Sequence, residues 1–180
     1  MTLDELLDRA ELGAVTAGDL DALDPDDPEL LDAVFELDER HRYKDGGWSS
    51  VSLYDEDPCE VAVFALSAGA EIPLHDHPGM TVHQRVVRGA VELDAWDLVD
   101  PTDASRGARH VGRTVADVAA GTLTLHPTRA NLHRVRALTD AVFVDVLTPP
   151  YGDGRRCSEW RVDEEPDAAD IGRLVWVRTL

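Results

Sequence analysis

The spacing of apolar residues divides the chain into a helical N-terminal part and a long strand-rich part. Up to about residue 42, apolar residues recur at helical intervals, and Leu3, Leu6 and Leu7 form the first stripe. Thr2 and Glu5 stand in the pattern of a capping box, in which both side chains bond free amides at the start of a helix. A helix is therefore predicted to begin after Thr2.

Two further helices are predicted before the spacing changes. Residues 16–23 form a short candidate helix, which the prolines at positions 25 and 28 would end. Asp26 and Asp27 can cap a third helix, whose buried face is predicted to contain Leu30, Leu31, Val34, Phe35 and Leu37. Such a face can dock a partner protein, but we expect it to pack on the core of this chain.

A period of two begins after a turn predicted at residues 44–47. Strands are predicted over residues 51–54, 61–66, 85–98, 111–118, 122–126, 133–138, 141–147, 160–162 and 174–178. Gly89 is predicted to join two arms of a hairpin, and residues 100–109 to form a polar surface loop. Many short strands with glycine and proline turns are typical of an all-β barrel or jelly roll. We therefore predict one domain, with a helical segment (1–47) packed outside a barrel (48–180).

Composition limits the choice of partners and compartment. The 180 residues are 43% hydrophobic, which is enough for a sizeable core. The net charge is −19 and Lys44 is the only lysine, so we expect no nucleic-acid or membrane partner. No apolar run is long enough to span a membrane, and the acidic N-terminus lacks the pattern of a signal peptide, so a cytoplasmic location is expected. The acid excess is interpreted as surface hydration at high salt, which predicts a halophilic host.

Three histidines are the candidate metal ligands. His75 and His77 are two residues apart, so in a strand both imidazoles would point to the same face. They are followed by Pro78 and Gly79, and a third histidine, His133, comes much later. A histidine is often only a hydrogen-bonded structural residue, so the pair by itself leaves both interpretations open.

The spacing around these histidines fits the metal motif of the cupin barrels. Gly69 stands before His75, and Val82 occupies the position where most metal cupins place a glutamate ligand. Three imidazoles without this carboxylate would leave open positions on an octahedral ion, and imidazole suits iron, zinc, copper and nickel alike.

Several segments resemble the thiol dioxygenase family of cysteamine dioxygenases and plant cysteine oxidases. The resemblance runs in order from about Tyr54 to Val162. Its most specific parts are Ile72-Pro73-Leu74-His75-Asp76-His77-Pro78-Gly79-Met80, Asn131-Leu132-His133 and Asp145-Val146-Leu147-Thr148-Pro149-Pro150-Tyr151. The tail, Gly154-Arg155-Arg156-Cys157 followed by Trp160-Arg161-Val162, is also similar.

The resemblance implies a cupin-type double-stranded β-helix, or jelly-roll barrel, with Fe(II) held by His75, His77 and His133. It implies that both atoms of O2 are added to a thiol to give a sulfinate. The thiol would belong to cysteamine, a small aminothiol, or to the N-terminal cysteine of a peptide, and we expect the protein to act as a monomer. Asp145 would bond a neighbour of the metal or the substrate amine, and Tyr151 would place a phenol near the oxygen-binding side.

Alternatives remain open at this point. Asp145 can instead cap a turn at the end of a strand, and Tyr151 can simply pack behind two prolines. An inward-pointing arginine, from Arg85, Arg88 or Arg129, would make free cysteine or a mercapto-acid the substrate. Another metal-dependent cupin enzyme and a non-enzymatic small-molecule-binding cupin are the rival functions.

Departures from the family pattern concern the remaining cysteines and histidines. Glu159 stands where relatives often have a tyrosine, so a cross-link built from Cys157 is not expected. Cys59 and Cys157 are expected to be reduced thiols. The histidines interpreted as structural, surface or neighbouring residues, and not as ligands, are His41, His83, His110 and His126.

Overall fold

The computed structural model describes residues 1–41, 47–99, 106–152, 154–167 and 169–180. The turn predicted at residues 44–47, with Lys44, lies outside these residues except for Gly47. The loop predicted at residues 100–109 lies partly outside them, and its last part was wrong. Residues 106–109 begin a strand that continues to Asp117.

Three helices open the chain, α1 (Leu3–Glu11), α2 (Ala17–Ala22) and α3 (Pro28–His41). The predicted capping box is present at the start of α1, and Thr16 and Asp19 form a second one at α2. Asp27 Oδ1 accepts hydrogen bonds from the backbone amides of residues 29 and 30, so it caps α3 as expected. None of these helices is both long and apolar enough to cross a membrane.

The buried face of α3 is narrower than predicted. Leu30, Val34 and Leu37 are buried, as expected for one line of residues along a helix. Leu31 and Phe35, however, are 46% and 67% exposed, so the prediction was wrong for these two. Each follows a buried residue by one position, which places it about 100° further round the helix, away from the buried line.

Eleven strands follow in the described part of the chain. Their bounds are β1 (Trp48–Glu56), β2 (Cys59–Leu66), β3 (Glu71–Asp76), β4 (Thr81–Arg88), β5 (Ala90–Leu98), β6 (Arg106–Asp117), β7 (Leu123–Leu125), β8 (Leu132–Ala137), β9 (Ala141–Thr148), β10 (Trp160–Val162) and β11 (Leu174–Thr179).

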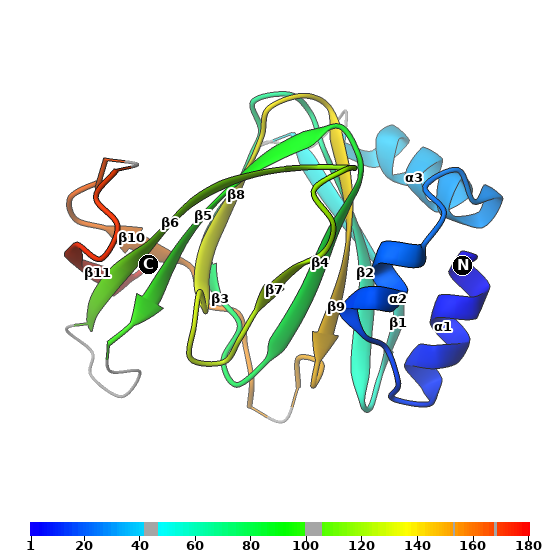
Figure 1. The fold of residues 1–180 in the computed structure, drawn as a ribbon, viewed down its shortest axis with the longest axis horizontal. Coiled ribbons are helices and arrows are strands. Elements are labelled where there is room, and N and C mark those ends of the chain that lie inside the picture. Colours follow the sequence, from blue (N-terminus) through cyan, green and yellow to red (C-terminus); the bar gives the residue numbers. More distant parts are fainter. Residues whose placement is uncertain (42–46, 100–105, 153, 168) are drawn as a thin grey trace.

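The strands form two antiparallel sheets that face each other (Figure 1). The first sheet has the order β1-β2-β9-β4-β7, and the second has the order β10-β11-β6-β5-β8-β3. Strands β3, β4 and β5 alternate between the two sheets, and β8 and β9 pair with strands that are distant in the sequence, as in a jelly roll. The all-β prediction of a cupin-type double-stranded β-helix with short N-terminal helices is confirmed.

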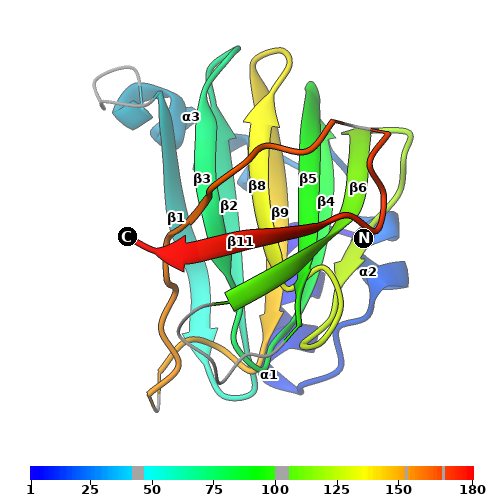
Figure 2. The ribbon, with the colours of Figure 1, turned by 90° about the vertical axis from the view of Figure 1, so that its left-hand side faces the viewer.

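The sheet of β1, β2, β9, β4 and β7 is buried on both faces. Along β9, Val142, Val144 and Val146 pack against the helices, whereas Phe143 and Leu147 point into the barrel. This explains why residues 141–147 are apolar on both faces of the strand except at Asp145, and do not alternate between apolar and polar residues. The helices lie on the outer face of this sheet, opposite the end of the molecule that carries β10 and β11 (Figures 1 and 2).

The hairpin predicted around Gly89 was wrong. Gly89 follows β4 in one sheet and precedes β5 in the other, so the chain crosses between sheets instead of folding back on itself. The residue has a φ of +73°, and an added Cβ would lie 2.1 Å from the carbonyl oxygen of Asp140. The crossing therefore needs glycine for its backbone conformation and for its lack of a side chain.

Replacing Gly89 with Ala should destabilise the fold more than replacing Gly69 with Ala. Both residues have a positive φ, but nothing lies within 4 Å of an added Cβ at Gly69. Gly69→Ala should cost about 1–2 kcal/mol for the backbone conformation alone. Gly89→Ala should cost at least about 1 kcal/mol more because of the clash, as measured by urea unfolding. Equal losses of stability would show that the crossing is not tightly packed.

Candidate metal centre

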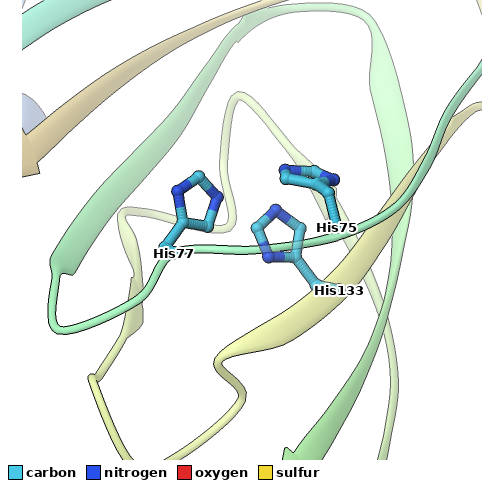
Figure 3. A group of neighbouring side chains, drawn as sticks. All are labelled: His75, His77 and His133. Carbon is cyan, nitrogen blue, oxygen red and sulfur yellow. The ribbon is translucent and has the colours of Figure 1, made fainter. Parts of the chain in front are cut away.

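The pairing of β3 with β8 brings the three candidate histidines together (Figure 3). His75 on β3 stands directly opposite His133 on β8. The ring centroid of His75 lies 4.9 Å from that of His77 and 4.3 Å from that of His133, and the last two are 5.0 Å apart. One nitrogen of each ring lies within 4.8 Å of the others. The three residues predicted from the sequence therefore form one cluster.

His77 reaches this cluster from just beyond the strand. β3 ends at Asp76, and the backbone amide of His77 donates to the carbonyl of Asn131, just before β8, at 3.3 Å. Strand alternation thus correctly predicted that His75 and His77 point to the same side. His77 is held there by its bond to Asn131, however, and not by the pairing of β3 itself.

Hydrogen bonds on the outer side of two rings fix their orientation. His75 Nδ1 lies 2.8 Å from the carbonyl oxygen of Pro73, which can only accept, so Nδ1 carries the proton. The hydroxyl of Tyr151 donates to the carbonyl of Asp76 at 3.2 Å and lies 2.7 Å from His77 Nδ1, from which it accepts. Each ring therefore keeps an Nε2 lone pair for a ligand, as in metal sites whose histidines are oriented by a second bond.

Burial keeps the imidazoles uncharged. It lowers the pKa of His77 to about 3, with the neighbouring His75 adding to the effect. Burial also lowers the pKa of His133 well below its usual value, and the pKa of His75 is lowered for the same first reason. At neutral pH all three rings are neutral, which is the form that binds a metal.

The cluster fits a transition metal. His77 Nε2 is buried and has no hydrogen-bond partner among the described residues, and the same is true of His133 Nδ1. A buried polar atom without a partner costs about 1–3 kcal/mol. An ion bound at His77 Nε2 would remove that cost, and three imidazoles suit iron, zinc, copper or nickel. Val82, at the position of the missing glutamate, is fully buried in the apolar core.

A cavity of about 200 Å³ opens beside the histidines, between the two sheets. Trp48, Phe64 and Phe143 form an aromatic wall, in which the last two rings stack at 4.8 Å between centroids. Tyr151 and Cys157 also line it. The predicted Tyr151 therefore contacts a candidate ligand and the cavity at once.

Asp145 lies on the opposite wall of this cavity. It is 4% exposed, and its Oδ1 has no hydrogen-bond partner among the described residues. Burial raises the pKa of Asp145 to about 8; the amide of Gln84 opposes the rise and the charge of Glu60 adds to it. The side chain faces the cavity from β9, so it is not a carboxylate at the end of a strand that caps a turn.

The arginines predicted as possible carboxylate ligands do not line this cavity. Arg85 Nη1 donates to the carbonyl of Leu20 in α2, on the outer face of the sheet. Arg129 lines a different cavity, beside β7, and Arg88 is exposed. Among the described residues that line the histidine cavity there is no arginine or lysine.

The other histidines and cysteines lie mostly apart from the cluster. His83 lies away from the cluster, because the chain turns after His77 and β4 is in the other sheet. Its Nδ1 lies 2.9 Å from Thr124 Oγ1. His110 is buried, with Nε2 2.7 Å from Asp94 Oδ1, and His126 is exposed. The His41 side chain lies outside the described part of the structure. Cys59 is buried under α1, and both cysteines are free thiols.

Two residues of the cavity were missed by the sequence analysis. Glu60 on β2 and Gln84 on β4 both line it from the same sheet as Asp145. Alternation along β4 was the available indication, because Gln84 lies between the inward-facing Val82 and Val86. A polar residue at an inward position of a barrel strand is a candidate for binding.

The chain is similar to proteins of a known family. The family model described as PCO_ADO matches residues 20–170. The 2-aminoethanethiol dioxygenase of Homo sapiens is 33% identical over 69% of this chain and 58% of its own length. Plant cysteine oxidase 1 of Arabidopsis thaliana is 30% identical over 59% of this chain and 39% of its own. The chain thus spans about three fifths, or less, of these two relatives.

Solved structures share the fold at low sequence identity. An 11S globulin from Wrightia tinctoria has a TM-score of 0.50 and 12% identity, covering 68% of this chain and 29% of that chain. A protein with a double-stranded β-helix domain from Klebsiella pneumoniae has a TM-score of 0.49 and 18% identity, covering 68% and 87%.

Replacing Asp145 with Asn should change how the stability of the metal-free protein depends on pH. The folded protein holds the Asp145 proton up to about pH 8, whereas the unfolded chain releases it near the ordinary pKa of 3.8. Between these values the unfolded chain binds fewer protons, so the wild type loses stability as pH rises, by up to about 1.4 kcal/mol per unit.

Asp145→Asn lacks this proton and should lose none of that stability. Urea unfolding of both metal-free proteins from about pH 5 to about pH 8 measures the difference, to which the histidines contribute equally in both. Parallel pH curves would contradict the buried, protonated state of Asp145.

Proposed function

The chain belongs to the PCO_ADO family, and on this premise we propose that it is an iron-dependent thiol dioxygenase. It would add both atoms of O2 to the thiol of cysteamine or of an N-terminal cysteine. The observation that carries the proposal is the cluster of three neutral imidazoles beside a cavity, in a chain whose relatives are named for the oxidation of aminothiols and cysteine.

In this proposal His75, His77 and His133 hold Fe(II). Bound iron would lower the pKa of a coordinated thiol and hold sulfur and dioxygen side by side. The reaction needs no external reductant, because the two oxygen atoms take their electrons from the sulfur as the thiol becomes a sulfinic acid.

The remaining residues prepare the cavity. Tyr151 holds the ring of His77 through its Nδ1 proton, and the aromatic wall of Trp48, Phe64 and Phe143 limits the entry of water. Asp145 would accept a hydrogen bond from the substrate amine. An ammonium group beside this carboxyl favours its ionised form, so amine binding and loss of the Asp145 proton are linked.

The rival functions have less support. Free cysteine and mercapto-acids carry a carboxylate, and no arginine or lysine among the described residues lines the cavity to bind it. A non-enzymatic binding protein would bind thiols without consuming oxygen. Oxygen uptake by the iron-loaded protein with cysteamine separates these cases: uptake with sulfinate formation supports the proposal, and binding without uptake contradicts it.

The cytoplasmic location, monomeric state and halophilic host stay predictions.

Replacing His133 with Ala should abolish iron binding and oxygen uptake while the fold persists. The ring lies within 5.0 Å of both other rings and would supply one of three donors, so its loss leaves too few ligands for a stable site. Iron content and circular dichroism measure the two effects.

The matched control is His126→Ala, which removes an exposed histidine from the loop that leads to β8. This variant should keep its iron and its activity. An active, iron-loaded His133→Ala variant would refute the ligand assignment.

Replacing Tyr151 with Phe should weaken iron binding about tenfold, because partners that orient a metal-bound histidine typically contribute 10–100-fold in affinity. Competition with a chelator measures the change. Tyr54→Phe is the control, since the Tyr54 hydroxyl bonds the carbonyl of Asp57 on the β1–β2 turn, at 3.5 Å. Equal iron affinity of Tyr151→Phe and the wild type would leave Tyr151 as a packing residue.

A further inference from the structure

The wall opposite the histidines carries a row of polar side chains on three adjacent strands. Asp145 on β9 is directly opposite Gln84 on β4 in the strand register. On its other side, Asp145 pairs with Ala62 of β2, which places Glu60 on the diagonal position, opposite Leu147. Diagonal neighbours on one face of a sheet are within reach of long side chains. Glu60, Asp145 and Gln84 all line the cavity.

Two members of this row, Gln84 and Asp145, are buried and have side-chain atoms without a hydrogen-bond partner in the described part of the chain. Gln84 is 2% exposed, and both atoms of its amide, like Asp145 Oδ1, have no hydrogen-bond partner among the described residues. Buried polar groups are normally paired, so unpaired ones that face a cavity indicate a ligand. A ligand with N–H donors could bond both Asp145 Oδ1 and the amide oxygen of Gln84.

The charge of the row indicates which ligand it takes. Glu60 is half-buried, and burial raises the pKa of its carboxyl, with the charge of Asp55 adding to the rise and the Ser52 hydroxyl opposing it. This wall has two neighbouring carboxyl groups and no lining arginine or lysine among the described residues, so it offers no positive charge to bind an anion. A cation placed between Glu60 and Asp145 would favour the ionised form of both carboxyl groups and bind to them.

We propose that Glu60 is a specificity-determining residue, which joins Asp145 in binding the amine of the substrate and excludes thiols that carry a carboxylate instead. The proposal rests on the thiol dioxygenase function and adds to it a residue that selects the substrate. Gln84 would complete the row by bonding the same amine through its amide oxygen.

Glu60 suits this role better than the other glutamate in the cavity. Glu159 is exposed, and its backbone pairs with that of His75 on the histidine side. Glu60 is less exposed and lies next to Asp145, so its charge is less screened by water where the amine would bind.

The test compares cysteamine with 3-mercaptopropionate, in which a carboxylate replaces the aminomethyl group. For the iron-loaded protein, kcat/KM is measured by oxygen uptake with each thiol, and the affinity is measured by anaerobic calorimetric titration. The wild type should prefer cysteamine in both measurements. Glu60→Gln keeps the shape and removes the charge, so the preference should fall about tenfold, as expected for one partly buried charge pair.

Two control variants separate a local contact from a general effect of charge. Asp55→Asn removes a charge from the exposed cross-strand partner of Glu60, outside the cavity. Because burial, and with it the Asp55 charge, raises the pKa of Glu60, this variant should keep the preference for cysteamine or increase it. Glu60→Asp keeps the charge and should retain more of the preference than Glu60→Gln. Circular dichroism checks that each variant is folded.

The possible results distinguish this inference from the function itself. If the wild type forms no sulfinate from either thiol, the proposed function fails, and the anaerobic titration still tests the binding of the amine. If the wild type does not prefer cysteamine, the role of Glu60 is overturned. It is also overturned if Glu60→Gln keeps the full preference, or if Asp55→Asn loses as much of it.

Discussion

The site depends on one strand pairing, the antiparallel contact between β3 and β8. This register sets His75 opposite His133 and brings in His77 through the backbone bond to Asn131. The same pairing buries the rings, and burial keeps them neutral at the pH where a metal would bind. A slip of one residue would turn every side chain of β3 to the other face and disperse the cluster.

The sheet of β1, β2, β9, β4 and β7 supplies the opposite wall of the cavity, and the N-terminal helices help to hold it in place. Helices α1, α2 and α3 cover its outer face with apolar contacts, so this sheet has an apolar core on its outer face in addition to the one inside the barrel. The inner face can then carry Glu60, Gln84 and Asp145 in place of core residues. The proposed metal donors and the proposed substrate-binding groups thus come from different sheets and line the same cavity between them.

The sequence predicted the cluster of three histidines better than the residues around it. Histidine spacing and the family resemblance were sufficient to predict that His75, His77 and His133 come together, because both depend on particular residues at particular positions. The crossing between sheets at Gly89 could not be predicted from the alternation of apolar and polar residues, because a strand alternates in the same way in either sheet. Leu31 and Phe35 showed that helical spacing does not fix the width of a buried face. Glu60 and Gln84 lie beside Asp145 only because β2 and β4 pair with β9, and no local sequence pattern predicts that pairing.

The central claim is that iron held by three imidazoles, beside this cavity, allows molecular oxygen to oxidise the sulfur of an aminothiol. Mass spectrometry of cysteamine after exposure of the iron-loaded protein to isotopically labelled dioxygen tests it most directly. The account predicts a sulfinate in which both added oxygen atoms carry the label. A product with oxygen from water, or an unchanged thiol in the presence of fully loaded protein, would contradict it.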